Sequence, residues 1–263
     1  MRSEFDTDTA VERGGDDLFR ARITDRWNTF AGPNGGYVLA TAVRALAEIA
    51  PMPHPFTVTG HFLRPPRPGD AEIGTELIKA GRRHATAHAR LSQDGKDVLV
   101  VLATFADLAT AKGRELVFNE PPPLPAPDAA IDPLGALDAA VIPPIAHRMD
   151  LRVAEIPGFV EGRPSGRPEF SAWIRFADRR PPDPLALIFF ADGMVPTVFE
   201  IGELVSSTVE MTVHVRALPA DGWLAMRVRT RHVIRGYHEE DAELWDSTGS
   251  LVAQSRQLAL LGG

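Results

Sequence analysis

The pattern of apolar and polar positions occurs twice along the chain. An apolar, alanine-rich segment over residues 35–50 predicts a helix, and segments with the alternating or β-branched character of strands follow it. A second apolar segment over residues 184–199 is again long enough for a helix and is followed by similar strands. Each set contains a hairpin signal, at residues 92–97 and 246–250, where glycine supplies the positive φ that such turns need.

The two strand regions correspond to each other position by position. Matching residues lie 152 to 154 positions apart: Arg64 with Arg216, Gly69 with Gly222, Leu91 with Leu244, and Gly95 with Gly249. This nearly constant separation indicates an internal duplication, although few paired residues are identical. A helix followed by antiparallel strands, present twice, predicts an α+β architecture. Since one helix covers only one face of a sheet, we expect the two units to pair.

A segment rich in proline and alanine separates the two halves. Residues 119–144 show no sustained periodicity, and proline lacks an amide donor and fixes its own φ, which favours an extended connector. We therefore expect an N-terminal domain over residues 1–110, a linker over 111–147 and a C-terminal domain over 148–263.

Composition narrows the class of protein. Of the 263 residues, 44% are hydrophobic and 24% charged, which is ordinary for a soluble protein, and the net charge of −7 argues against nucleic-acid or anionic-membrane partners. The absence of cysteine excludes disulfides, thiolate metal sites and cysteine nucleophiles. The polar N-terminus lacks the apolar core of a signal peptide, and no apolar run is long enough to span a bilayer. We expect a cytoplasmic protein.

Common catalytic motifs do not occur. There is no G-x-S-x-G elbow, Walker A loop or H-E-x-x-H site. His84 and His88 lie in a segment that alternates like a strand, so we expect no metal there. The stretch "GPNGGY" over residues 32–37 leads into the first helix, and the amides of Gly35 and Gly36 could face an anion or oxyanion. A plain turn is an equally good interpretation of this stretch.

Four segments together resemble the acyl-CoA thioesterase II family, whose members contain two fused hotdog domains. They read "GPNGGYVLATAVRA", "HFLRPPRPG", "AGRRHATAHARLSQDGK" and "LWDSTGSLVAQSRQLAL". The resemblance implies a tandem (double) hotdog fold, in which each unit has a long central helix wrapped by an antiparallel β-sheet. It also implies hydrolysis of acyl-CoA thioesters without a cofactor, and association into a dimer of double hotdogs.

The same resemblance implies a catalytic set of one Asp, one Ser or Thr, and one Gln. Asp192 and Gln257 match the first and third. Thr208 matches the second if the motif is kept unbroken, whereas Ser207 matches if the strand is anchored on its terminal arginine; we prefer Thr208. The first helix has no corresponding Asp, so one active centre per chain is expected. By itself, Asp192 would be interpreted as a helix N-cap.

These residue types suit hydrolysis by an activated water. Asp192 could take the proton of a water that Thr208 and Gln257 hold by hydrogen bonds, and burial would raise its pKa and basicity. We expect no acyl-enzyme, since no nucleophile–base pair is visible. The candidate substrate-binding residues are Gly35 and Gly36 for the oxyanion, Arg64, Arg82 and Arg235 for coenzyme A, and Phe190 and Met194 for the acyl chain.

Two other functions remain open from the sequence. A protein of this fold could bind acyl-CoA or lipid without turnover, since binding and catalysis would share one pocket. A hotdog hydratase or dehydratase is the other alternative, but such enzymes usually require a His base in the first helix region. None of the eight histidines lies in either expected helix.

Overall fold

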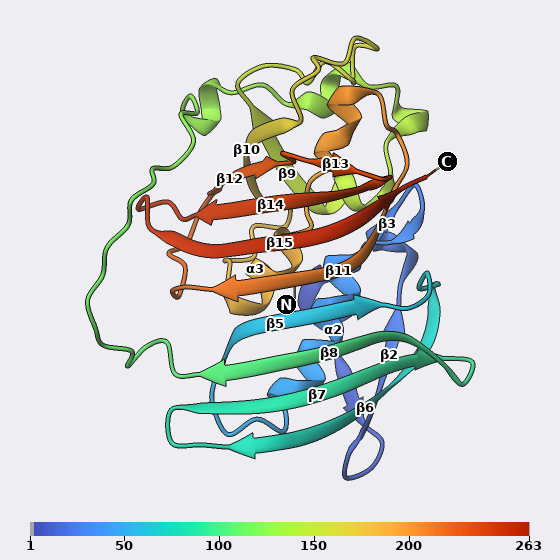
Figure 1. The fold of residues 1–263 in the computed structure, drawn as a ribbon, viewed down its shortest axis with the longest axis vertical. Coiled ribbons are helices and arrows are strands. Elements are labelled where there is room, and N and C mark those ends of the chain that lie inside the picture. Colours follow the sequence, from blue (N-terminus) through green and yellow to red (C-terminus); the bar gives the residue numbers. More distant parts are fainter. Residues whose placement is uncertain (1–2, 263) are drawn as a thin grey trace.

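One long antiparallel sheet curves around two helices in the computed structural model, which describes residues 3–262 (Figure 1). The N-terminal half contains α1 (Glu4–Asp8), β1 (Val11–Arg13), β2 (Leu18–Ile23), η1 (Asp25–Trp27), β3 (Asn28–Thr29), β4 (Gly32–Pro33), α2 (Gly35–Ala47), β5 (His54–Phe62), β6 (Gly69–Ala80), β7 (His84–Gln93) and β8 (Lys96–Ala106). The remainder contains η2 (Pro127–Ala129), η3 (Pro133–Ala136), η4 (Ala139–Val141), η5 (Pro144–Arg148), β9 (Met149–Val153), β10 (Glu169–Phe176), α3 (Pro184–Phe190), η6 (Thr197–Ile201), β11 (Ser206–Val215), β12 (Leu224–Arg229), β13 (Val233–Ile234), β14 (Tyr237–Trp245) and β15 (Leu251–Leu261).

The two halves meet in the middle of the sheet. The strand order is β1-β2-β6-β7-β8-β5-β11-β15-β14-β12-β10-β9, so β5 of one half pairs with β11 of the other. Thr59 pairs with Thr212, 153 positions later, and their hydroxyl oxygens lie 2.9 Å apart. Equivalent residues therefore face each other across the junction, as expected for a duplicated chain folded about a pseudo-twofold axis. The predicted α+β architecture is confirmed.

The glycines that mark the duplication occupy equivalent turns. Gly95 and Gly249, in the β7–β8 and β14–β15 hairpins, have φ values of 70° and 81°. Gly69 and Gly222 also have positive φ, at 144° and 116°. Residues with a Cβ rarely adopt this region, so the matching glycines record a shared backbone requirement.

The two helices differ in length. The first was expected over residues 35–50 and is observed as α2, but the second ends at Phe190, well short of residue 199. Gly193 and Pro196 explain the difference: glycine is a weak helix former, and proline both lacks an amide donor and disfavours helical backbone before it. The side chain of Asp183 caps α3 by accepting from the Ala186 amide at 2.7 Å. Asp192 therefore follows α3 and is not its N-cap.

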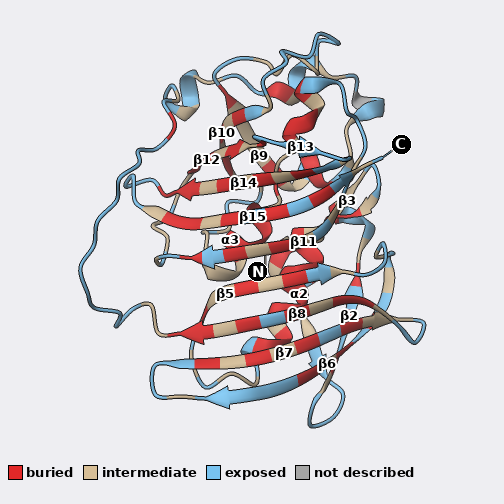
Figure 2. Ribbon diagram, viewed as in Figure 1, coloured by how far each residue is buried: buried red, intermediate tan, exposed pale blue. Residues whose placement is uncertain are grey.

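The core lies between the helices and the concave face of the sheet. Figure 2 shows buried residues along both helices and at alternate positions of the strands. Helices α2 and α3 pack against each other. Around this contact lies a group of fully buried aromatic side chains, contributed by both halves and by α1: Phe5, Trp27, Tyr37, Phe176, Phe189 and Phe190.

The segment after β8 is fastened to the C-terminal half. Asn119 donates to the Glu243 carboxylate at 2.8 Å, and the Trp173 indole donates to the Pro125 carbonyl at 2.8 Å. Further along, Ile131 forms a bridge with Val153 at the end of β9. Among residues 3–262, no helix is both long and apolar enough to cross a membrane.

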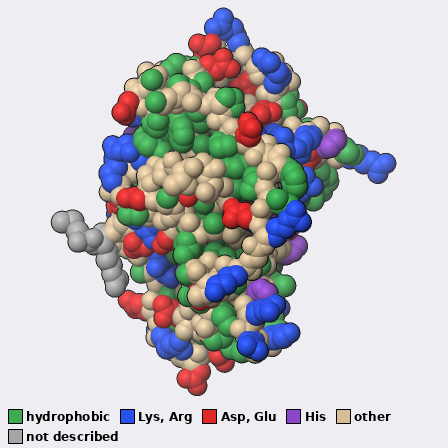
Figure 3. Space-filling view, turned by 90° about the vertical axis from the view of Figure 1, so that its left-hand side faces the viewer, with side chains coloured by type: hydrophobic (Ala, Val, Ile, Leu, Met, Phe, Trp, Pro, Cys, Tyr) green, Lys and Arg blue, Asp and Glu red, His purple; other side chains and the backbone are tan. Residues whose placement is uncertain are grey.

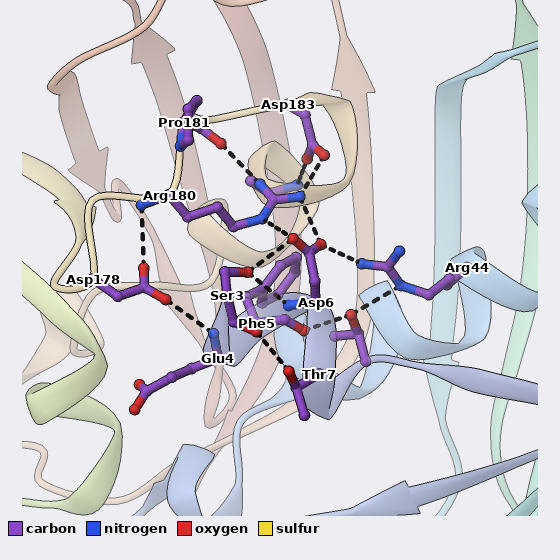
Figure 4. A network of polar contacts seen from close by, with 12 residues as sticks. Ser3, Glu4, Phe5, Asp6, Thr7, Arg44, Asp178, Arg180, Pro181 and Asp183 are labelled. Carbon is purple, nitrogen blue, oxygen red and sulfur yellow. Dashed lines mark hydrogen bonds and ion pairs between the residues drawn. The ribbon is translucent and has the colours of Figure 1, made fainter. Parts of the chain in front are cut away.

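A partly buried ionic network ties the N-terminus to both helices (Figure 4). The Asp6 carboxylate accepts two hydrogen bonds from Arg180 at 2.9 and 3.0 Å and one from Arg44 of α2 at 2.9 Å. Arg180 also donates to Asp183, the cap of α3, and its own side chain is only 9% exposed. These hydrogen bonds outweigh the burial of Asp6 and lower the pKa of its carboxyl to about 2.

We expect Asp6→Asn to lower the free energy of unfolding by about 2 kcal/mol at pH 7. The pKa of Asp6 is lower in the folded state, so its stabilisation is complete above pH 4 and is lost as the pH falls toward 2. Urea unfolding at pH 7 and pH 3 measures the difference. Asp70→Asn is the control, because the Asp70–Arg22 pair is largely exposed and should contribute little. Equal losses from both variants would contradict the assignment.

Candidate functional site

The carboxylate of Asp192 lies against the N-terminus of α2, the helix of the other half. Its Oδ2 accepts from the Gly36 amide at 2.8 Å and from Asn34 Nδ2 at 2.9 Å. Asn34 Nδ2 also donates to the Asp192 carbonyl at 2.8 Å. Amides at the start of a helix point outward without intrahelical partners and favour a negative charge. The aspartate is thus held at the junction between the two halves.

Asn34 holds both the start of α2 and Asp192 in place. It was not among the site residues predicted from the sequence. Its Oδ1 accepts from the Tyr37 amide at 2.9 Å as the N-cap of α2, while its Nδ2 serves Asp192. The signal was an asparagine directly before an apolar helix, which is a common cap. The second use of its amide depends on α3, which is distant in sequence.

Gly36 permits the close approach of the two helices. A Cβ at this position would lie 2.7 Å from the Phe189 carbonyl oxygen and 2.8 Å from the Cβ of Asp192. Only glycine therefore fits without displacing α3. The amides of Gly35 and Gly36 do face an anion, as considered above, but that anion is the protein's own carboxylate. The Gly36 N–H is consequently not free for a substrate oxyanion.

Burial makes Asp192 an unusually basic carboxylate. Desolvation raises its pKa to about 6, and hydrogen bonds from Gly36, Asn34 and Gly35 partly oppose the rise. A carboxylate with a pKa near 6 remains ionised at neutral pH while accepting a proton far more readily than an exposed aspartate.

Thr208 and Gln257 form the second part of the site. The Thr208 hydroxyl, on β11, donates to Gln257 Oε1 on β15 at 2.9 Å. Gln257 Nε2 donates to Glu240 Oε1 on β14 at 2.8 Å. The other oxygen of Glu240 accepts from the amide and the hydroxyl of Thr197 at 2.7 and 2.9 Å. Glu240 was not among the residues selected from the sequence, where it stands in a charged run that favours a solvated strand.

A β-bulge brings Thr208 rather than Ser207 into the site. Met211 and Val213 point to the core, so strict alternation would also turn Ser207 inward and Thr208 outward. The register shifts between Thr208 and Glu210, which reverses the alternation beyond the bulge. Thr208 therefore faces Gln257, and Ser207 is exposed. One extra residue in the strand explains why the two ways of aligning the motif disagreed.

The two parts of the site are neighbours. The Ser255 hydroxyl, two residues before Gln257 on β15, donates to the carbonyl of Ala191 at 3.5 Å. The negative charge of Asp192 also adds to the effect of burial, which raises the pKa of Glu240 to about 7. In the described part of the chain, Asp192 makes no direct hydrogen bond to Thr208 or Gln257. The arrangement offers a basic carboxylate beside a hydroxyl and an amide, which together can bind and deprotonate a water.

The other predicted residues are distributed unevenly. Phe62 is the last residue of β5, and its ring lies beside Gly35. Arg64 follows two residues later and is exposed. Arg235 is exposed in the β13–β14 turn, beside the last residues of β15, at the same end of the sheet as Thr208.

Arg82 lies far from this site. It is exposed in the β6–β7 hairpin, and the register places that hairpin beside His54, where β5 begins. Figure 3 views the molecule from this end, and basic side chains gather in the lower part of that face. The structure thus separates Arg82 from Asp192, Thr208 and Gln257.

The two residues expected to line an acyl pocket differ in exposure. Phe190 has no exposed surface and packs against Phe176 and Phe189 in the aromatic core. Met194 is half-buried at the edge of the core, two residues from Asp192. Met194 is therefore better placed than Phe190 to contact a bound molecule. Within residues 3–262, no three His, Asp or Glu side chains are grouped as a metal site would require.

Comparisons with known proteins agree with this fold. A family model for the acyl-CoA thioesterase N-terminal domain matches residues 23–106, and one for the C-terminal domain matches residues 118–261. A candidate thioesterase II from Thermobifida fusca superposes with a TM-score of 0.87 at 29% identity, covering 99% of this chain and 98% of that one. A protein with a hot dog fold from Alicyclobacillus acidocaldarius gives 0.88 at 23% identity, with 100% and 99% covered.

A fungal protein is similar in sequence as well. The thioesterase-like protein TwmA of Talaromyces wortmannii is 24% identical over 318 residues, which cover 98% of this chain and 91% of its own. Together with the structural neighbours, these matches confirm the double hotdog fold.

The raised pKa of Asp192 carries a cost in stability that a substitution should remove. An aspartate whose pKa rises from 3.8 to about 6 on folding destabilises the folded state progressively between these pH values, by up to ~3 kcal/mol above them. We expect Asp192→Asn to raise the free energy of unfolding at pH 8 and to have little effect at pH 4. Chemical unfolding at both pH values measures this. A variant that is less stable than the wild type at pH 8 would contradict the raised pKa.

Proposed function

Since the chain belongs to the acyl-CoA thioesterase family, with both of its domains matched, we propose that it hydrolyses the thioester of an acyl-CoA to a free acid and coenzyme A. The observation that carries the proposal is the pairing of a half-buried, basic carboxylate on Asp192 with the Thr208–Gln257 hydrogen bond beside it. Neither half of the chain provides this combination alone, because the N-terminus of α2 holds Asp192 and the second half supplies the other groups.

Asp192 acts as the general base. Its Oδ2 is engaged by Gly36 and Asn34, so Oδ1 is the oxygen that accepts the proton of the attacking water. The hydroxide equivalent adds to the thioester carbonyl carbon to form a tetrahedral oxyanion. When that intermediate collapses, the carbon–sulfur bond breaks, and the proton held by Asp192 neutralises the departing thiolate. The products are a carboxylic acid and the thiol of coenzyme A.

Thr208 and Gln257 position the water. The Thr208 hydroxyl donates to Gln257, so its lone pairs remain able to accept a hydrogen bond from the water. Gln257 uses one N–H for Glu240 and retains a second, which can donate to the water or to the developing oxyanion. This second N–H takes the place of the Gly36 amide, which Asp192 occupies.

Coenzyme A binds at the same end of the sheet. Its phosphates require cations, and Arg64 and Arg235 are exposed there. Met194 lies beside Asp192 and contacts the acyl chain in this proposal. Association of two chains into a dimer of double hotdogs, expected from the family resemblance, stays a prediction.

A matched series of variants tests the proposal by release of free thiol from acyl-CoA of increasing chain length. We expect Asp192→Asn to lower kcat by roughly 10²–10⁴-fold, because it removes the base but retains the hydrogen-bond acceptor. Thr208→Val should lower kcat about tenfold or more, whereas Ser207→Ala, its exposed neighbour, should stay within twofold.

The outcomes separate the remaining functions. Unchanged turnover in Asp192→Asn would remove that residue from the mechanism. A wild-type protein that binds acyl-CoA but releases no thiol would be a binding protein. If Ser207→Ala were impaired instead of Thr208→Val, the structural choice between the two hydroxyls would be wrong.

A further inference from the structure

Glu240 is a buried carboxylate that the mechanism above leaves without a role. It lies on β14 directly opposite Gln257 of β15, and only 6% of its surface is exposed. Its two oxygens accept from Gln257 and from Thr197. No residue in the described range 3–262 forms an ion pair with it. A buried carboxylate without a cation is unfavourable, so its presence beside Gln257 calls for an explanation.

The carboxylate determines which way the Gln257 amide faces. A glutamine amide can be turned so that its oxygen and nitrogen exchange places. An ionised carboxylate only accepts hydrogen bonds, so Gln257 must present Nε2 to Glu240 and Oε1 to Thr208. Thr208 then donates to that oxygen, and its lone pairs face the position of the water.

We propose that Glu240 is a positioning residue, whose carboxylate holds the Gln257 amide in the one orientation that presents an acceptor on Thr208 and a donor on Gln257 to the water beside Asp192. This inference rests on the proposed hydrolysis, which gives Gln257 its role. Glu240 itself contacts neither the substrate nor the water.

A proton on Glu240 would reverse the orientation. The backbone N–H of Thr197 can only donate, so the oxygen that it contacts continues to accept and the proton resides on Oε1. Oε1 would then donate to Gln257, which must turn its amide oxygen toward Glu240. Gln257 Nε2 would then donate to the Thr208 hydroxyl oxygen. The lone pair that accepts this hydrogen bond would no longer be available to the water.

The charge on Glu240 depends on a small set of neighbours. The charge of Asp192, after α3, acts on Glu240, and His238, also on β14, is connected to Glu240 by hydrogen bonds. Thr230 makes this connection. Its hydroxyl oxygen lies 2.8 Å from the Thr197 hydroxyl oxygen and 3.2 Å from His238 Nδ1. Burial lowers the pKa of His238, so it is neutral at physiological pH. Burial, with the charge of Asp192 adding to it, raises the pKa of Glu240 to about 7.

Glu240→Gln tests the proposal with little change in size. The backbone N–H of Thr197 continues to donate to the side-chain oxygen at position 240. The new side-chain nitrogen then faces Gln257 and donates to its amide oxygen, so the Gln257 amide is turned to the reversed orientation. In the full-length protein we expect kcat to fall about tenfold or more while KM stays within twofold. Glu239→Gln is the control, because Glu239 is the adjacent residue on the opposite face of β14, and it should stay within twofold of wild type. An unchanged kcat in Glu240→Gln would overturn the proposal.

A double-mutant cycle separates positioning from a general structural role. If Glu240 acts only through Gln257, then adding Glu240→Gln to Gln257→Ala should change kcat by less than twofold. A further loss of about tenfold in that background would overturn the proposal, because it would show an effect that does not pass through the amide.

A measurement without turnover distinguishes this proposal from the proposed hydrolysis. The side-chain NH₂ signals of Gln257 can be identified by their loss in Gln257→Ala in ¹H–¹⁵N NMR spectra. We expect these signals to shift with a midpoint near pH 7 in the wild type and to lose that transition in Glu240→Gln. If the NMR signals behave in this way but no thiol is released, the positioning role of Glu240 stands and the proposed hydrolysis is wrong. If the wild type releases thiol but the Gln257 signals change neither with pH nor in Glu240→Gln, only the positioning role of Glu240 is wrong.

Discussion

The placement of Asp192 against the first turn of α2 is the contact on which the site depends. A carboxylate with so little contact with water would ordinarily lose its charge. Here the amide of Gly36 and the side chain of Asn34 stabilise the ionised form just enough for the pKa to remain near 6. The same contact requires glycine at position 36, because any Cβ would collide with α3. One junction between the halves thus sets helix packing and chemical reactivity together.

Duplication supplied the framework, and local departures from symmetry supplied the chemistry. Thr59 and Thr212 still meet across the pseudo-twofold axis. The second helix ends early, however, which frees Asp192 from helical geometry and lets it reach the other half. The bulge in β11 then turns Thr208 toward Gln257. The shortened helix occurs only in the second half, which is consistent with one site per chain, whereas the bulge has an equivalent in β5 between Pro55 and Thr57.

The sequence was sufficient for the architecture, because periodicity and turn glycines are local signals. Motif resemblance selected Asp192, Thr208 and Gln257, whose catalytic role stays a proposal. It could not supply Asn34 or Glu240, whose importance comes from partners more than a dozen residues away in the chain. It also misplaced Arg82, since only the register of β5 to β8 shows which end of the sheet a hairpin occupies. Long-range geometry decides these cases, and residue type alone does not reveal it.

The central claim is that a carboxylate held near pH 6 by the first turn of α2 generates the nucleophile from water. The pH dependence of kcat/KM for acyl-CoA hydrolysis by the wild-type protein, measured from pH 5 to 8, tests it most directly. The account predicts that log kcat/KM falls as the pH drops below about 7 and is at least tenfold lower at pH 5 than at pH 8. A rate that does not change across this range would contradict it.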